Sequence, residues 1–393
     1  MNILPGTLVC TVGTSLFYPN LERLDPDLTE MTGGARSAAF RKCKEHYIQK
    51  DWPALGRALI RIPPDHRLCG AEINSIEAMV RKGFLGEDRV RLILLISDTE
   101  EGKAMGRVLE AYFLDPDCPV RFQYVSSRVV AGLQDAEPLR FRREGLGNLV
   151  RALGEELRKW GASSMAVNAT GGYKAQIALA VAFGQAAGCP VYYKHEKFDQ
   201  VIRFPQVPFA LDLGLVNDHA ELWADLAEPD AAVPYEDLLR ALGAGSPQME
   251  AMEPLLEIEA VDAERLAALS ALGLVYWEAY LSQNPDKMIE PPRTAHRMGC
   301  RFPQHHYPKG FIDYVQKVYE AFPHWITGCH TLPYSGQAAL NHGRFLERDR
   351  AICGEYVDAG GFGARFEVRT TARNALHRRF VLHQLNHWSK GNN

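Results

Sequence analysis

The chain has 393 residues, of which 46% are hydrophobic and 23% are charged, a composition that excludes collagen, coiled coil and wholesale disorder. No apolar run reaches the roughly 18 residues needed to cross a bilayer. The apolar residues 3–12 lack the basic flank and cleavage site of a signal peptide, so we expect a cytoplasmic protein without membrane contacts. Eight scattered cysteines without a Cys-x-x-Cys pair predict buried, reduced thiols and argue against disulfides and a standard zinc site.

Charge is distributed unevenly along the chain, although the formal net charge is only −4. Residues 291–393 contain 14 Lys and Arg, 7 Asp and Glu, and nine of the 13 histidines. The residues before them are acidic, with a net charge of −11. A basic, histidine-rich segment of this kind is typical of phosphate or nucleic-acid chemistry.

Residues 1–216 alternate short apolar runs with amphipathic stretches. The apolar runs predict strands at residues 7–12, 90–96, 120–125, 164–167 and 190–194. Residues 146–160 predict a helix, because apolar side chains recur there at helical spacing. Strands that alternate with helices predict an α/β domain with a parallel, doubly wound, Rossmann-like sheet. Such sheets bind ligands at the carboxyl ends of their strands.

Residues 217–290 are acidic and rich in Leu and Ala. They predict helices at residues 220–226, 235–242 and 263–272, followed by an apolar stretch at 274–281, which suits a small helical, winged-helix-like connector. A winged helix that reads DNA needs basic side chains on its recognition helix, and residues 262–272 offer only Arg265. A connector or dimerisation role is therefore favoured over a ligand-responsive, non-enzymatic transcription regulator.

Residues 284–292 contain three prolines and mark a domain boundary, and residues 291–393 predict a compact α+β domain. The pattern of residues 311–321 predicts an amphipathic helix. Residues 351–357, 364–370 and 379–388 predict three strands of an antiparallel meander.

Two turns in the first domain are expected to bind a ligand. The first, residues 12–15, follows the first strand, and the second, residues 168–174 (NATGGYK), leads from the fourth strand into a helix. Small hydroxyl residues and paired glycines let backbone N–H groups approach an anion, and a lysine at the helix start adds a positive charge. The turns match neither a Walker A loop nor a dinucleotide fingerprint. They predict a phosphate cradle, unless the glycines serve only a tight turn. The predicted ligand-binding residues are Thr14, Ser15, Thr170, Gly171, Gly172 and Lys174.

The second turn, together with residues 188–196 (GCPVYYKHE), resembles the second motif of the CARF domain, a CRISPR-associated Rossmann fold that senses cyclic oligoadenylate. The stretches at residues 12–15 (VGTS), 71–75 (AEINS) and 96–102 (ISDTEEG) are similar to the same family. The resemblance implies a homodimer that binds one cyclic tetra- or hexa-adenylate across its two-fold axis through the predicted ligand-binding residues. A symmetric ring suits such a dimer, because both subunits present the same turns to equivalent phosphates. The activator is the only small molecule that the resemblance implies.

CARF sensors usually carry an effector, and residues 353–368 and 379–388 resemble the strand meander of RelE/ParE-like toxins. RelE members are ribosome-dependent mRNA interferases. Arg365 falls at the arginine of one of their strand motifs, and His387 falls where relatives have a His-Arg pair. The preceding strand offers Glu355 and Asp358 where some RelE proteins have lysines. The resemblance implies a type III CRISPR ancillary effector that cleaves mRNA at the ribosome.

Cleavage of RNA without a metal requires a base for the 2′-OH, a cation for the phosphorane and an acid for the leaving oxygen. Strand alternation predicts that Arg365, Glu367 and Arg369 share one face of their strand. Alternation also predicts that Arg379, His383 and His387 share one side of the final strand. If the two strands pair, their arginines, carboxylate and imidazoles would meet on one polar surface. The predicted catalytic residues are Arg365, Arg379, His383 and His387, with no metal.

Three other assignments are open at this point. Arg378 and His383 fit the Arg-x4-6-His motif of HEPN ribonucleases, but HEPN domains place it on a helix within an all-helical bundle, whereas residues 380–382 favour a strand. A restriction-type DNA nuclease needs an Asp…Glu-x-Lys series, which does not follow residues 343–347. A zinc site is disfavoured because no standard spacing occurs among Cys300, His305, His306, Cys329 and His330.

Overall fold

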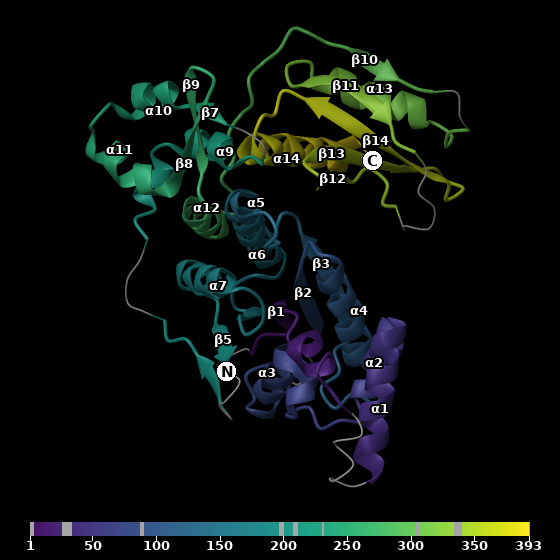
Figure 1. Ribbon diagram of the computed structural model, residues 1–393. Helices are drawn as coiled ribbons and strands as arrows, with labels where there is room; N and C mark the ends of the chain where they lie inside the picture. The colour runs from purple at the N-terminus through teal and green to yellow at the C-terminus, as the bar shows by residue number, and fades with distance from the viewer. Residues whose placement is uncertain are drawn as a thin grey trace. The chain divides into compact units, whose positions relative to one another are not determined.

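A computed structural model describes residues 4–25, 34–86, 90–195, 200–206, 211–229, 232–303, 306–333 and 340–392 of the chain. The chain forms two compact units (Figure 1). The first unit comprises Met1–Asp218 and Pro234–Pro285, and the second unit comprises His219–Val233 and Asp286–Asn393. Among the described residues, no helix has both the length and the apolar character that crossing a membrane requires.

A six-stranded sheet with the order β3-β2-β1-β4-β5-β6 forms the centre of the first unit. Its strands are β1 (Thr7–Thr11), β2 (Arg91–Ser97), β3 (Tyr124–Val130), β4 (Met165–Asn168), β5 (Val191–Lys194) and β6 (Val201–Arg203). The first five run parallel, and β6 pairs antiparallel with β5. The predicted parallel α/β sheet is therefore confirmed. The chain reverses its direction of winding between β1 and β4, and doubly wound folds bind ligands at the carboxyl edge of such a switch point.

The third strand is displaced from its predicted position. Val120 and Phe122 gave the apolar signal, but they are buried in the segment that approaches the strand. The strand itself, β3, lies at the edge of the sheet and carries Ser126, Ser127 and Arg128. An edge strand is less enclosed than a central one, so it tolerates polar side chains that hide it from an apolar pattern.

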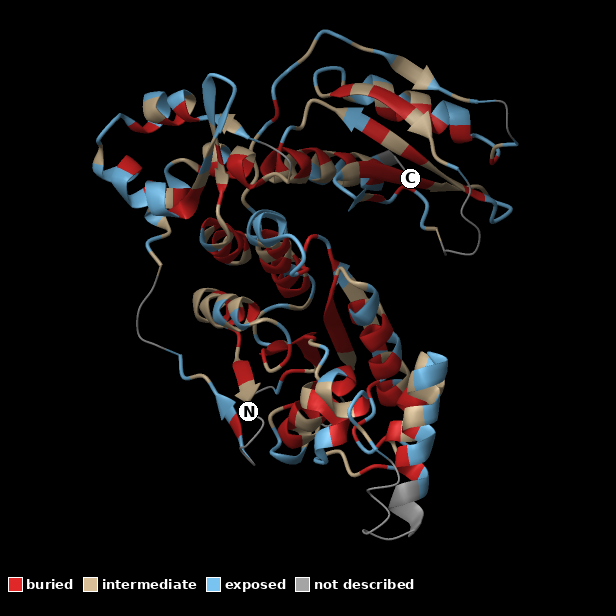
Figure 2. Ribbon diagram, viewed as in Figure 1, coloured by how far each residue is buried: buried red, intermediate tan, exposed pale blue. Residues whose placement is uncertain are grey.

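Helices cover both faces of this sheet and bury its core (Figure 2). They include α1 (Gly34–Gln49), α2 (Trp52–Leu59), α3 (Gly70–Arg81), α4 (Glu100–Leu114), α6 (Leu146–Trp160) and α7 (Lys174–Ala187). The predicted helix at residues 146–160 is confirmed as α6, whose apolar stripe includes the buried Leu149, Leu153 and Leu157. Two helices start with side-chain caps that their sequences supply: Asp51 accepts a hydrogen bond from Ala54 N–H, and Thr99 accepts one from Gly102 N–H.

The segment that follows the sheet contains helices and a β-hairpin. Its elements are α8 (Gly214–Asn217), α10 (Tyr235–Leu242), α11 (Pro247–Met252), β8 (Leu256–Val261), β9 (Glu264–Leu269) and α12 (Ala271–Gln283). The helix predicted at residues 263–272 is wrong, because β9 pairs antiparallel with β8 there. Ala and Leu favoured a helix, but Ala267 and Leu269 are buried in strand alternation, and Asp262 adopts the positive φ of 54° that a two-residue turn requires.

A five-stranded sheet with the order β10-β11-β14-β13-β12 organises the second unit. Its strands are β10 (Gly299–Arg301), β11 (Ile326–Thr331), β12 (Phe345–Arg348), β13 (Ala351–Val357) and β14 (Gly363–Thr370). Its helices include α9 (Ala220–Ala227), α13 (Phe311–Ala321) and α14 (Ala375–Asn392). The predicted helix at 311–321 and the strands at 351–357 and 364–370 are confirmed by α13, β13 and β14.

The strand predicted at residues 379–388 is wrong, because these residues belong to α14. Asn374 begins the helix, since its side-chain oxygen accepts a hydrogen bond of 3.0 Å from His377 N–H. His377, Val381 and Leu385 are buried four residues apart, which is helical spacing. The apolar run at 380–382 therefore reflects a helix that packs on a core, and its strand propensity is overridden by packing.

The second unit has two layers. Buried side chains of α13 and α14 pack together against one face of the sheet, which contributes Phe366 and Val368 from β14 and Ile352 from β13. The opposite face carries the alternate residues of the same strands, including Arg365 and Glu367. The predicted alternation of β14 is therefore confirmed, and one sheet face is apolar while the other is charged.

Candidate functional site

The two predicted ligand turns lie side by side in the first unit. Leu8 of β1 is opposite Ala166 of β4 in a parallel pair, so both strands end at the same edge of the sheet. Thr11 donates its hydroxyl hydrogen to the carbonyl oxygen of Gly171 over 2.6 Å and links the ends of the strands. We call the turns that follow, residues 12–15 and 169–173, the cradle loops. They form one surface at the switch point of the sheet.

Glycine is required where the cradle loops touch. A Cβ atom on Gly13 would lie 2.7 Å from the backbone nitrogen of Gly172, and one on Gly171 would lie 2.9 Å from the backbone nitrogen of Gly13. Gly172 also has a φ of +95°, which other residues rarely adopt. The glycines therefore serve the close approach of two backbones as well as the turn itself.

Two of the predicted ligand-binding hydroxyls help to build the loops. Thr170 donates its hydroxyl hydrogen to Asn168 Oδ1 over 2.6 Å and accepts a hydrogen bond of 3.0 Å from Lys194 N–H. Ser15 Oγ accepts a hydrogen bond of 3.2 Å from Ala71 N–H at the start of α3. These contacts hold each loop to a neighbouring element, a role that the sequence did not reveal.

Of the other predicted ligand-binding residues, Gly171 is buried and three face solvent. Thr14, Gly172 and Lys174 are exposed. Within the described part of the chain, the backbone N–H groups of Gly172 and Lys174 have no hydrogen-bond partner. They lie where the 14-residue helix α7 begins, so free N–H groups, the positive end of the helix dipole and an ammonium group meet at one place. Such a place can bind a phosphate. Glu196, the last residue of the resembling motif, lies outside the described residues.

A buried carboxyl group lies directly beneath the cradle loops. Glu72 of α3 is 0% exposed, and its Oε1 accepts a hydrogen bond of 2.7 Å from Gly13 N–H. A Cβ atom on Gly171 would lie 2.0 Å from the same oxygen, so the carboxyl also touches the second loop. Burial raises the pKa of Glu72 to about 7. The sequence placed Glu72 only within residues 71–75, a stretch similar to the CARF family, and did not mark it as a site residue.

The structure separates Arg365 from the other predicted catalytic residues. Arg365 lies on the charged face of the sheet, where its Nε donates to Glu355 Oε1 over 3.1 Å, and the two side chains are only 10% and 2% exposed. His330 of β11 lies opposite Glu367 on the same face. Burial and the nearby Arg369 lower the pKa of His330. Because α14 packs on the other face, the expected convergence of Arg365 with the histidines is not found.

Arg379, His383 and His387 still share one side of their element. Residues four apart lie on the same side of a helix as well as of a strand. The three side chains therefore lie on one side of α14, as they were predicted to lie on one side of a strand. His383 and His387 are exposed one turn apart, with ring centroids separated by 6.4 Å, and Arg379 is half-buried. Two imidazoles at this separation can act as a base and an acid on one substrate.

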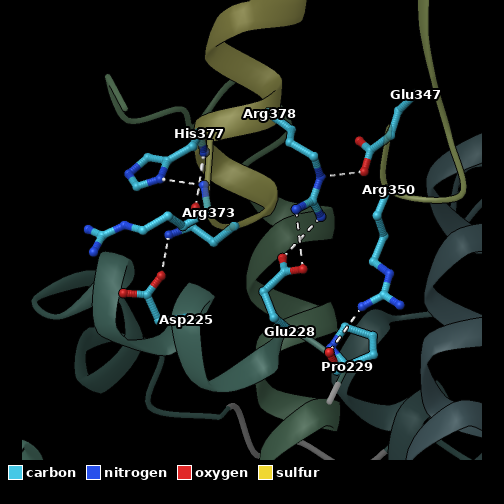
Figure 3. A network of polar contacts seen from close by, with 9 residues as sticks. Asp225, Glu228, Pro229, Glu347, Arg350, Arg373, His377 and Arg378 are labelled. Carbon is cyan, nitrogen blue, oxygen red and sulfur yellow. Dashed lines mark hydrogen bonds and ion pairs between the residues drawn. The ribbon is translucent and has the colours of Figure 1, made fainter. Parts of the chain in front are cut away.

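Arg378, the arginine of the HEPN-like alternative, belongs to a buried ion-pair network (Figure 3). Its Nε donates to Glu347 of β12 over 2.6 Å, and its terminal nitrogens donate to Glu228 over 3.0 and 3.2 Å. The neighbouring Asn374 donates to Asp225 of α9 over 2.7 Å. Arg378 is 8% exposed and fully engaged in joining α14 to residues 219–229. The unit also contains a five-stranded sheet, unlike an all-helical HEPN bundle.

The candidate zinc ligands that the structure describes do not form a metal site. Cys300 and Cys329 are cross-strand neighbours on β10 and β11, whereas His330 follows Cys329 and therefore points to the opposite face. His305 lies outside the described residues. No group of three or more His, Cys, Asp or Glu side chains that could hold a metal ion occurs in the part of the chain that is described.

Comparison with protein families relates part of the chain to a CRISPR-associated family. The model of a family described as CRISPR-associated protein (Cas_APE2256) matches residues 67–207. This range begins just before α3 with Glu72 and extends through the second cradle loop, α7 and β5. The matched part of the first unit is thus similar to a CRISPR-associated family.

Among solved structures, the chain matches Can2 from Sulfobacillus thermosulfidooxidans, determined in complex with cyclic tetra-adenylate. The sequence identity is 10%, the TM-score is 0.23, and the match covers 81% of this chain and 84% of Can2. A TM-score this low establishes no equivalence between residues of the two chains.

Proposed function

We propose that this chain is a type III CRISPR ancillary effector whose first domain, residues 1–216, binds cyclic oligoadenylate, with cyclic tetra-adenylate as the ring. The observation that carries the proposal is the convergence of two glycine-containing loops, free N–H groups and Lys174 at the switch point of a parallel sheet. Phosphodiester groups of the ring would accept hydrogen bonds from the N–H groups of Gly172 and Lys174. The match of residues 67–207 to a CRISPR-associated family supports the same biological setting.

The ring would bind between two copies of the chain. Each cradle presents one exposed Lys174 and one helix start, and a two-fold symmetric ring offers two equivalent sets of phosphates to them. Thr14 would line the same half-site, the buried Gly171 would let the two loops approach each other, and Ser15 and Thr170 would hold the loops in place. Residues 217–290 would act as a winged-helix-like connector between the sensor and the effector, because their helices and β-hairpin carry few basic side chains.

The Lys174→Ala variant tests the ligand site. It removes a charge-assisted phosphate contact worth ~1.5–3 kcal/mol from each half-site, so a symmetric dimer should lose affinity twice over. Calorimetric titration of cyclic tetra-adenylate should show a loss of at least about a hundredfold. Lys82→Ala is the matched control, because Lys82 is equally exposed but lies at the far end of α3. Equal affinities in wild type and Lys174→Ala would remove the cradle from the site.

We infer that the C-terminal domain, residues 291–393, is a metal-independent endoribonuclease that ligand binding activates. Its excess of Lys and Arg suits an RNA substrate. The exposed side of α14 supplies His383 and His387 as base and acid, and Arg379 as the cation for the phosphorane. Arg365 would support the fold of the sheet through Glu355.

The RelE-like function, cleavage of mRNA at the ribosome, is proposed from the resemblance of the meander sequence. The helix α13 and the antiparallel strands β13 and β14 suit that resemblance. The helix α14 in place of the final strand departs from it. Comparing naked RNA with translating ribosomes as substrates decides whether a ribosome positions the message.

A further inference from the structure

We propose that Glu72 couples proton uptake to ligand binding: its carboxyl group is neutral when an anion occupies the cradle loops, and its ionised form weakens binding. Glu72 is thus a positioning residue whose charge sets the affinity of the site. This inference rests on the proposed binding of cyclic oligoadenylate and adds a regulation that the proposed function does not contain.

The position of the carboxyl carries the argument. Oε1 accepts the N–H of Gly13 in the first cradle loop and touches the backbone of Gly171 in the second. Oε2 is buried and has no hydrogen-bond partner within the described residues. The backbone N–H groups of Gly13 and of Glu72 itself favour the charged form, but Oε2 has no donor and burial outweighs both of them. A proton on Oε2 would remove that charge and leave the bond from Gly13 intact.

Neighbouring groups do not neutralise this carboxyl. On β1 the titratable group beside it is the Cys10 thiol, whose pKa is raised by burial and by Glu72 itself, so it stays uncharged. The other elements at the site contribute neutral groups: Ser75 from α3, Asn168 from the end of β4 and Gln176 from α7. Lys174 and Lys194 belong to the same region of the unit, but no ion pair joins either to Glu72 among the described residues, and neither is among the causes of its pKa shift.

The bound anion and the ionised Glu72 would lie on opposite sides of the cradle loops. They would repel each other, because buried backbone between two charges screens them less than water does. Ligand binding must then raise the pKa of Glu72 above the value of about 7 that burial gives it. Below this pKa the neutral form of Glu72 dominates, so the affinity of the site for the anion is highest there. The affinity falls as the pH rises through the pKa. Linkage limits the fall to about tenfold per pH unit for each half-site.

The test is calorimetric titration of the full chain with cyclic tetra-adenylate between pH 6 and 8.5, a range in which the ring's phosphodiesters keep their charge. Wild-type affinity should fall above pH 7, and binding at pH 7 should take up about half a proton per chain, read from two buffers of different ionisation enthalpy. Glu72→Gln keeps an acceptor for Gly13 N–H without a charge, so its affinity should not vary with pH. Glu77→Gln, on the same helix, should keep the wild-type slope.

Each outcome decides a separate point. A flat wild-type profile with tight binding, or no proton uptake, would overturn the role of Glu72 and leave the proposed ligand in place. A Glu72→Gln variant that retains the slope would do the same. Absence of binding at every pH would overturn the proposed function and this inference with it. The proton count in wild type needs no variant, so it stands even if Glu72→Gln does not fold.

Discussion

Ligand-activated RNA cleavage should fall by ~10²–10⁴-fold in the His383→Ala, His387→Ala double variant, because general acid–base catalysis contributes this much. The two imidazoles lie exposed one helical turn apart on α14, where they can serve as base and acid on one bound substrate. Initial cleavage rates of labelled RNA, measured with saturating cyclic tetra-adenylate, check the prediction. Products of the wild type should end in a 2′,3′-cyclic phosphate or a 3′-phosphate, as expected when the 2′-OH attacks.

Two controls locate the chemistry. His324→Ala removes another exposed imidazole of the second unit and should leave the rate unchanged. Glu367→Gln alters the charged sheet face next to Arg369 and should also leave it unchanged. Loss of activity in Glu367→Gln together with full activity in the double variant would move the catalytic surface to the sheet face that carries Arg365.

Replacing Arg378 should destabilise the second unit more than any other single change to its charges. Arg378→Ala leaves the largely buried Glu228 without its cation and also removes the partner of Glu347, which is 34% exposed. Breaking a buried ion pair costs about 3–5 kcal/mol. Hydrogen exchange of the backbone amides in α9 and α14 should speed up accordingly, by more than about a hundredfold.

Arg373→Ala is the matched control. Its guanidinium is 61% exposed and lies 3.5 Å from Glu221, so its loss should cost less than ~1 kcal/mol. Exchange in Arg378→Ala at the rate of the Arg373→Ala variant would show that the network in Figure 3 contributes little to the packing of α14.

The parallel character of the first sheet and the two ligand turns could be anticipated because their signals are local. Buried parallel strands form continuous apolar runs, and the turn at residues 168–174 joins a strand to a helix within a few residues. The contact between Gly13 and Gly172 could not be anticipated, since it depends on β1 and β4 being neighbours. Glu72 was missed for the same reason: its burial is a property of the assembled loops.

The errors arose where packing overrides local preference. Residues 263–272 are composed of helix-forming residues, yet they pair with β8 because Ala267 and Leu269 are buried on one side. Residues 379–388 contain a strand-forming run, yet the cap at Asn374 and the buried Val381 and Leu385 make them a helix. In the first segment the neighbouring hairpin strand decides the structure, and in the second the cap and the packing of α14 on the sheet decide it.

The measurement that tests the central claim most directly is calorimetric titration of the wild-type chain with cyclic tetra-adenylate, with linear tetra-adenylate as the comparison. The account predicts saturable binding of one ring to two chains, and much weaker binding of the linear form, which cannot present two equivalent halves to a symmetric site. Absence of heat with the ring, or equal affinity for both forms, would contradict the claim that the cradle loops form a cyclic-oligoadenylate sensor.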